Sequence, residues 1–223
     1  MSYISFLSSL FLIGRNINKN SKLKIKITGD LKMIDENLFK ISFLLLLVFF
    51  YVVRGYFSKK YLKNESNFGK FPNLIKILFV TTVGTMILFP LIYIFTSVFD
   101  SYSLLIPEEI RILGIVLLFI VIVGMWWILR TLNINFDEDA QNRFVVSSGP
   151  YKYIRHPMYL VFIIQALAQG IISANLLVFI GLISIIILIV LRIRYEERLL
   201  IQEFGDDYLD YKKETKRIFP KIW

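Results

Sequence analysis

The chain has no cysteine and only one histidine, His156, among its 223 residues. Without cysteine it forms no disulfide, no thiolate metal site and no cysteine nucleophile. A single imidazole also argues against a histidine metal site, so we predict that no metal is bound. Charge is scarce as well: 19% of the residues are charged and 56% are hydrophobic, with a mean hydropathy of +0.62. Soluble domains carry about 25% charged residues, so this composition predicts a membrane protein.

The charge that is present is mostly positive, with 26 basic and 17 acidic residues and a net charge of +9. The basic residues cluster between apolar runs, where they suit contact with anionic lipid headgroups. No nucleic-acid-binding motif accompanies them. We therefore expect the lipid bilayer as a partner and no nucleic acid, and the sequence does not indicate an oligomeric state.

Long uncharged runs predict the membrane spans. They cover residues 41–53, 77–99, 112–129 and 158–191. A spanning helix needs about 20 apolar residues, so the second and third runs suffice, giving spans 77–99 and 111–130. The first becomes a span over 38–57 if the side chains of Lys40 and Arg54 reach the bilayer surface. Pro90 is expected to kink the second span without ending it.

The last uncharged run has 34 residues and would extend about 51 Å as one helix, against a hydrocarbon core of about 30 Å. Ser173-Ala174-Asn175 lies near its middle, which favours a hairpin with limbs 158–173 and 175–191 over one long tilted helix. The prediction is an all-α integral membrane protein of about five transmembrane helices. Both ends of the hairpin would then return to one side of the membrane, at a pocket closed by a C-terminal helix.

The distribution of lysine and arginine predicts the orientation. Residues 54–71, 130–157 and 192–223 together carry 17 of them, and residues 100–109 carry none. Basic loops stay in the cytoplasm, so the 17-charge side and its pocket should be cytoplasmic. Residues 1–37 are expected to form a separate basic, interfacial segment before a membrane domain of residues 38–223. Their own basic residues do not fit this orientation.

Two polar clusters flank the hairpin. In the first, Arg155 and His156 precede Pro157, which suits the first turn of a helix, and tyrosines surround them. In the second, Arg192 and Glu196 share one helix face. Alone, the first pattern is equally an interfacial anchor, and the second is equally a surface ion pair. The two patterns together, separated by a run of hairpin length, indicate a functional site more specifically than either pattern alone.

The motifs Gly149-Pro-Tyr, Arg155-His-Pro-x-Tyr, Glu196-Glu and Phe204-Gly-x-x-Tyr-x-x-Tyr make residues 143–220 resemble the isoprenylcysteine carboxyl methyltransferase family. The resemblance implies that segments 143–159 and 192–220 enclose S-adenosylmethionine at the cytosolic membrane face. It assigns Arg192 to the acceptor carboxylate and makes Arg192 and Glu196 the catalytic residues. The implied cofactor-binding residues are Arg143, Phe144, Val145, Val146, Tyr151, His156, Pro157, Met158, Tyr159 and Glu196.

The resemblance also implies methyl transfer to a lipophilic, prenylated acceptor. A carboxylate is the favoured acceptor, because it needs no general base and positioning can carry the catalysis. An amine acceptor would need a general base, which His156, Glu197 or a tyrosine could supply. Val161 stands where the family usually has glycine, which makes the substrate less certain. The alternatives are a phospholipid-amine or thiol methyltransferase, a sterol-type membrane reductase, and a non-enzymatic membrane protein.

Overall fold

The computed structural model describes residues 36–61, 71–135 and 144–219. The predicted interfacial segment 1–37 lies almost entirely outside these residues. The described chain contains helices and no strand beyond isolated bridges, which confirms the all-α prediction. Its α-helices are α2 (Glu36–Tyr61), α3 (Asn73–Phe95), α4 (Glu108–Asn135), α5 (Pro157–Ser173), α6 (Leu176–Phe204) and α7 (Asp206–Glu214), with 3₁₀ turns η2 (Asp100–Tyr102) and η3 (Gly149–Lys152).

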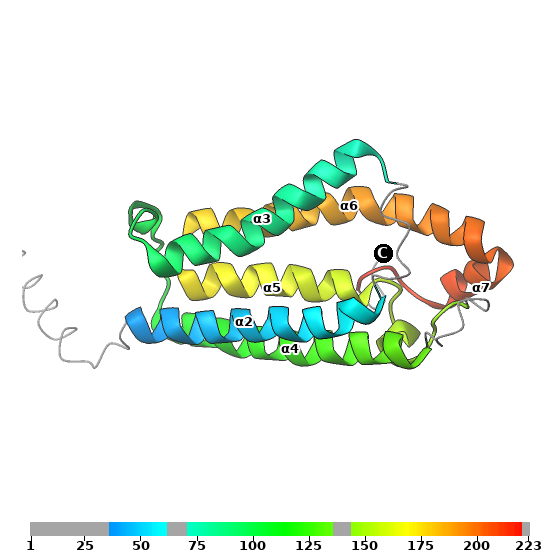
Figure 1. The fold of residues 1–223 in the computed structure, drawn as a ribbon, viewed down its shortest axis with the longest axis horizontal. Coiled ribbons are helices and arrows are strands. Elements are labelled where there is room, and N and C mark those ends of the chain that lie inside the picture. The colour runs from blue at the N-terminus through cyan, green and yellow to red at the C-terminus, as the bar shows by residue number, and fades with distance from the viewer. Residues whose placement is uncertain (1–35, 62–70, 136–143, 220–223) are drawn as a thin grey trace, which may run out of the picture. The chain divides into compact units, whose positions relative to one another are not determined.

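Helix α5 occupies the centre of the bundle. It lies between the pair α3 and α6 on one side and the pair α2 and α4 on the other (Figure 1). Every residue of α5 is buried or half-buried. Phe162 contacts both hydrophobic clusters of the domain, the one shared with α2 and α4 and the one shared with α3 and α6. The neighbouring helices therefore shield α5 from lipid.

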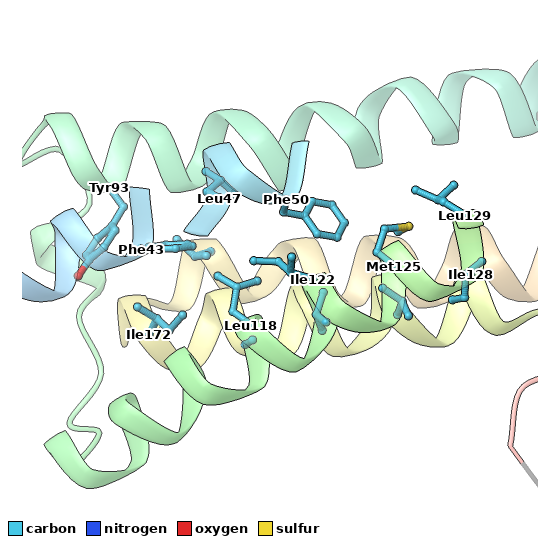
Figure 2. Packing of buried hydrophobic residues seen from close by; sticks show 14 of the residues in the cluster. Phe43, Leu47, Phe50, Tyr93, Leu118, Ile122, Met125, Ile128, Leu129 and Ile172 are labelled. Atoms are coloured by element: carbon cyan, nitrogen blue, oxygen red, sulfur yellow. The ribbon is translucent and has the colours of Figure 1, made fainter. Parts of the chain in front are cut away.

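Helix α2 packs onto this core through one face. Phe43, Leu47 and Phe50, spaced four and three residues apart, are buried and point toward α4 and α5 (Figure 2). The opposite face, which includes Phe49 and Val52, is exposed and suited to lipid. Lipid tails are as apolar as these side chains, so close packing rather than removal from water holds the helices together.

The turn between α5 and α6 confirms the predicted hairpin. Ala174 adopts a left-handed backbone conformation with a φ of 46°, and the Asn175 side chain accepts a hydrogen bond from the Leu177 amide as the N-cap of α6. Among the described residues, four helices are long and apolar enough to cross a membrane, and α5 is a shorter apolar helix of 17 residues. At 1.5 Å per residue, α5 is about 26 Å long, slightly shorter than the hydrocarbon core.

Polar groups from neighbouring segments allow α5 to end early. The buried Arg111 of α4 donates a 2.8 Å hydrogen bond from Nε to the carbonyl of Ile172, in the last turn of α5. Its guanidinium also reaches the Tyr93 hydroxyl at 3.1 Å. Asn175 Nδ2 donates to the Phe99 carbonyl at 2.7 Å. These partners satisfy backbone carbonyls that would otherwise be left bare inside the membrane.

Three helices begin or end at other residues than the predicted spans, because charge marks the end of an apolar run and not the end of a helix. Helix α3 begins at Asn73, directly after Pro72, and ends at Phe95, where Thr96 becomes extended and caps the Ile92 carbonyl with its hydroxyl. Helix α4 starts three residues before the predicted span, at Glu108, whose charge suits a helix N-terminus. Helix α6 continues well beyond residue 191, to Phe204.

Gly170→Ala should destabilise the hairpin, because a Cβ at Gly170 would lie 2.4 Å from the Phe179 ring of α6. Overpacking of this kind typically costs about 1–3 kcal/mol. The expected result is a lower midpoint of thermal unfolding in detergent. Gly84→Ala is the matched control, since nothing lies within 4 Å of its Cβ and alanine favours the helix. Equal midpoints for the two variants would contradict the close α5–α6 packing.

Candidate functional site

The hairpin brings the two polar clusters together at one end of the bundle. The Tyr159 hydroxyl, in the first turn of α5, donates a hydrogen bond to Oε2 of Glu196 on α6. The two residues are 37 positions apart in the sequence. Arg192 lies on the same face of α6, and its Nε is 3.8 Å from Glu196 Oε2. The predicted meeting of the His156 segment with Arg192 and Glu196 is therefore seen in the structure.

Aromatic rings surround the guanidinium of Arg192. Its central carbon lies 4.8 Å from the ring centre of Phe71, 5.3 Å from that of Phe79 and 6.0 Å from that of Tyr159. The faces of aromatic rings attract a cation, so these rings hold the charge at the edge of the bundle. The Nε atom is buried and has no hydrogen-bond partner. The guanidinium therefore keeps part of its capacity to bind a planar anion.

Glu197, the residue after Glu196, points the other way and forms a second centre. Its side chain is 3% exposed, and Oε1 lies 3.0 Å from Arg155 Nε and 3.6 Å from His156 Nε2. Oε2 lies 3.3 Å from Arg217 Nη2 and 3.6 Å from Lys212 Nζ. A carboxylate so deeply buried is stable only because several cations face it. Glu197 thereby joins α6 to the first cluster and to the C-terminal segment.

The C-terminal segment is fastened over the first cluster by backbone hydrogen bonds. The amides of Arg155 and His156 donate to the carbonyls of Lys216 and Arg217, at 2.7 and 2.9 Å. The Tyr211 hydroxyl of α7 donates to the Tyr151 carbonyl at 2.7 Å. Burial raises the pKa of Tyr211 to about 12, so its hydroxyl keeps the proton for this bond. Helix α7 and the residues after it thus close one side of the site (Figure 1).

Three buried polar atoms of the described site have no hydrogen-bond partner. His156 Nε2, Arg192 Nε and the Tyr208 hydroxyl are all buried and lack a hydrogen-bond partner. Burial, together with the nearby Glu197 carboxylate, raises the pKa of Tyr208 above its ordinary value, so its hydroxyl stays a donor. Buried polar atoms are usually paired, and a bound molecule with several hydrogen-bonding groups would pair these. The residues present are compatible with a cofactor such as S-adenosylmethionine.

The other predicted cofactor residues are less closely joined to this centre. Arg143 lies outside the described residues. Phe144 is exposed, Val145 and Val146 are half-buried, and no hydrogen bond or ion pair of the described chain joins the three to the cluster. The Tyr151 carbonyl accepts the hydrogen bond from Tyr211, and Pro157 is buried at the first position of α5. Met158 is half-buried against the core shared with α2 and α4.

Several structural partners were not predicted as such: Arg155, Tyr208 and Arg217 were not among the site residues, and Glu197 was considered only as a general base for an amine acceptor. Arg155, Glu197 and Tyr208 lie within the motifs that carried the resemblance, and Arg217 lies within the wider resembling region 143–220, so the sequence contained a signal for them. Their roles depend on contacts between segments 42 and 20 residues apart, such as Arg155 with Glu197 and Arg217 with Glu197. The spacing of residues within one helix cannot predict contacts between different segments.

Residues 105–202 match the model of the isoprenylcysteine carboxyl methyltransferase family, which confirms the predicted resemblance over the matched region. Methanethiol S-methyltransferase 1 of Bradyrhizobium diazoefficiens is 40% identical over 70 residues. The aligned region covers 31% of this chain and 24% of that protein, so the chain spans about a quarter of the curated relative it matches. Both matches are with methyltransferases, and the described helices include four candidate membrane spans.

Glu197→Gln should lower stability, because a neutral amide leaves Arg155 and Arg217 without their buried counter-charge. Breaking one side of a buried ion pair costs about 3–5 kcal/mol. The measurement is the midpoint of thermal unfolding of the purified protein in detergent. Glu203→Gln, at an exposed position of the same helix, is the matched control and should change stability by about 0.5 kcal/mol or less. A Glu197 variant as stable as this control would remove the structural role assigned to the carboxylate.

Proposed function

We propose that the protein transfers a methyl group from S-adenosylmethionine to a lipophilic acceptor at the membrane surface, and that the acceptor atom is a carboxylate oxygen. The observation that carries this proposal is the position of Arg192. Its guanidinium lies among aromatic rings beside Glu196, with Nε unpaired, directly after the uncharged run of α6. An apolar molecule with one anionic end would place that end at the guanidinium and its apolar part against the aromatic rings.

The residues that would hold the cofactor come from both clusters. Glu196 offers a carboxylate to its ammonium group or to its ribose hydroxyls, and His156 and Tyr208 offer unpaired polar atoms. Tyr159 orients Glu196 by donating a hydrogen bond to it. The C-terminal segment, tied down at Arg155 and His156, would restrict access of water from that side. Exclusion of water strengthens the electrostatic interactions inside a site.

When bound, S-adenosylmethionine supplies a methyl group whose bond to sulfur breaks with the electron pair left on sulfur, as the acceptor oxygen forms the new bond to carbon. A carboxylate attacks without losing a proton, so no general base is required. Arg192 would hold the carboxylate with one of its oxygens directed at the methyl group. Correct positioning alone lowers reaction barriers strongly.

A thiol acceptor is the second candidate, favoured by the similarity to methanethiol S-methyltransferase 1. A thiol reacts as its thiolate and needs a group that accepts the proton. Glu196 and His156 are the nearby candidates. The two acceptors are distinguished by the product, because methyl esters release methanol in mild base and methyl thioethers do not.

Arg192→Ala should reduce kcat/KM for a carboxylate acceptor by about 100-fold or more, because the acceptor loses its charged anchor. The value of kcat/KM is measured as the transfer of label from S-[methyl-³H]adenosylmethionine to N-acetyl-S-farnesylcysteine. Glu196→Ala should lower both cofactor binding and turnover. Arg194→Ala, two residues from Arg192 and exposed, is the matched control and should keep wild-type activity. Full turnover in the Arg192 and Glu196 variants would reject the assigned roles.

We propose that the site faces the cytoplasm, as the distribution of basic residues predicts. Because the natural chain has no cysteine, single cysteines can report the topology. Tyr153→Cys and Asp207→Cys, both exposed positions at the site, should react with a membrane-impermeant maleimide only after the cytoplasmic side is opened. Ser103→Cys, in the loop between α3 and α4, should react from the opposite side. Labelling of Tyr153→Cys and Asp207→Cys from different sides would exclude a shared pocket.

A further inference from the structure

The central helix carries two glutamines that the proposed chemistry does not use. Gln165 and Gln169 lie one turn apart on α5 and are 0% and 1% exposed. Neither Nε2 nor Oε1 of Gln165 has a hydrogen-bond partner, and Nε2 of Gln169 has none. The Tyr51 hydroxyl of α2 is the neighbouring group that comes nearest to pairing with Gln165, as a weak hydrogen bond outside normal geometry.

Unpaired amides are costly at this depth. A buried donor or acceptor without a partner costs about 1–3 kcal/mol, and no water is available in the hydrocarbon core to replace the partner. Polar side chains inside membrane proteins commonly mark the path of a substrate. A methionine or leucine would fill the same volume at no such cost. The two amides are therefore best explained by a ligand that pairs with them.

The glutamines lie on the α5 face that begins at Met158, the residue directly before Tyr159 of the site. Met158, Phe162, Gln165 and Gln169 follow one another at spacings of four, three and four residues, which is one helix face. This face is directed at α2, because the Arg54 guanidinium of α2 lies 4.7 Å from the ring centre of Phe162. At 1.5 Å per residue, Gln165 and Gln169 are about 10 and 16 Å farther into the membrane than Met158.

The α2 side of the bundle is the side that can admit a chain-like molecule. The extensive close backbone approaches among the described helices join α4 with α5, α3 with α6, and α5 with α6. Helix α2 instead contacts the core through large side chains, among them Phe43 and Phe50. Side chains of this kind change rotamer far more readily than tightly packed helix backbones separate. A ligand entering here needs side-chain movement rather than separation of the central helices.

From these observations we infer that the α5 face from Met158 to Gln169 is the subsite for the acceptor's tail, and that the tail carries a hydrogen-bonding group about 10 Å from the methyl-accepting atom. The inference rests on the proposed function, which places the accepting end at Arg192 and Tyr159. A carbonyl or hydroxyl in the tail would pair with Gln165, and a second with Gln169. A plain hydrocarbon tail would leave both amides unpaired, so such a site discriminates against it.

The test compares two acids that differ by one carbonyl, hexadecanoate and 8-oxohexadecanoate, whose keto group lies about 10 Å from the carboxylate. Binding is measured as the rise in thermal unfolding midpoint of the detergent-solubilised protein, and turnover as labelled methyl ester. The wild-type protein should bind and methylate the keto acid about 10-fold better, the effect of one buried hydrogen bond. Gln165→Met, which keeps the side-chain length without the amide, should abolish this preference and retain the binding of hexadecanoate.

The controls separate a subsite from a structural role. Gln202→Met, an exposed glutamine of α6, should keep the wild-type preference. If Gln165→Met does not fold, Gln169→Met is used with 12-oxohexadecanoate, whose keto group lies farther along the tail. Equal binding of the two acids by the wild-type protein, or an unchanged preference in the variants, would overturn the inference. Binding preference without any ester formation would instead reject the carboxylate acceptor and leave the subsite standing.

Discussion

The reversal of the chain at Ala174 and Asn175 is the constraint on which the rest of the structure depends. Because α5 and α6 are antiparallel neighbours, the segment that begins at His156 and the segment that contains Arg192 return to the same end of the bundle. The turn is itself fixed by side chains from elsewhere, with Arg111 on the Ile172 carbonyl and Asn175 on the Phe99 carbonyl. Contacts at one end of the bundle thus set the geometry of the site at the other.

At the site, consecutive glutamates have separate roles because successive residues of a helix point in different directions. Glu196 faces Tyr159 and Arg192, next to the proposed acceptor. Glu197 is buried among Arg155, Arg217 and His156 and joins three segments of the chain. The Glu196 carboxylate keeps hydrogen-bonding capacity for a ligand. The Glu197 carboxylate uses nearly all of its capacity on residues of the chain. One pair of acidic residues therefore supplies both a binding group and the connection that holds the binding segments in place.

Much of this arrangement follows from the sequence and some of it does not. The 34-residue apolar run could only be a hairpin or a long tilted helix, and the Ser173-Ala174-Asn175 turn favoured the hairpin, as found. Helix ends were missed at Phe95 and Phe204, because hydrophobicity reports the membrane boundary and backbone hydrogen bonding sets the helix boundary. The role of Glu197 was missed because its partners are distant in sequence. The unpaired amide of Gln165 was missed because a single polar residue within an apolar run carries no sequence signal of its own.

The central position of α5 among the other helices has a consequence for biosynthesis. A helix of 17 residues with two amides in its interior is a poor candidate for independent release from the translocon into lipid. Helix α6 follows after a two-residue turn and is longer and strongly apolar. We therefore expect α5 and α6 to enter the bilayer as one unit, in which insertion of the more apolar α6 makes insertion of α5 possible. The end of the bundle that holds the candidate site would then be assembled only after α6 has left the ribosome.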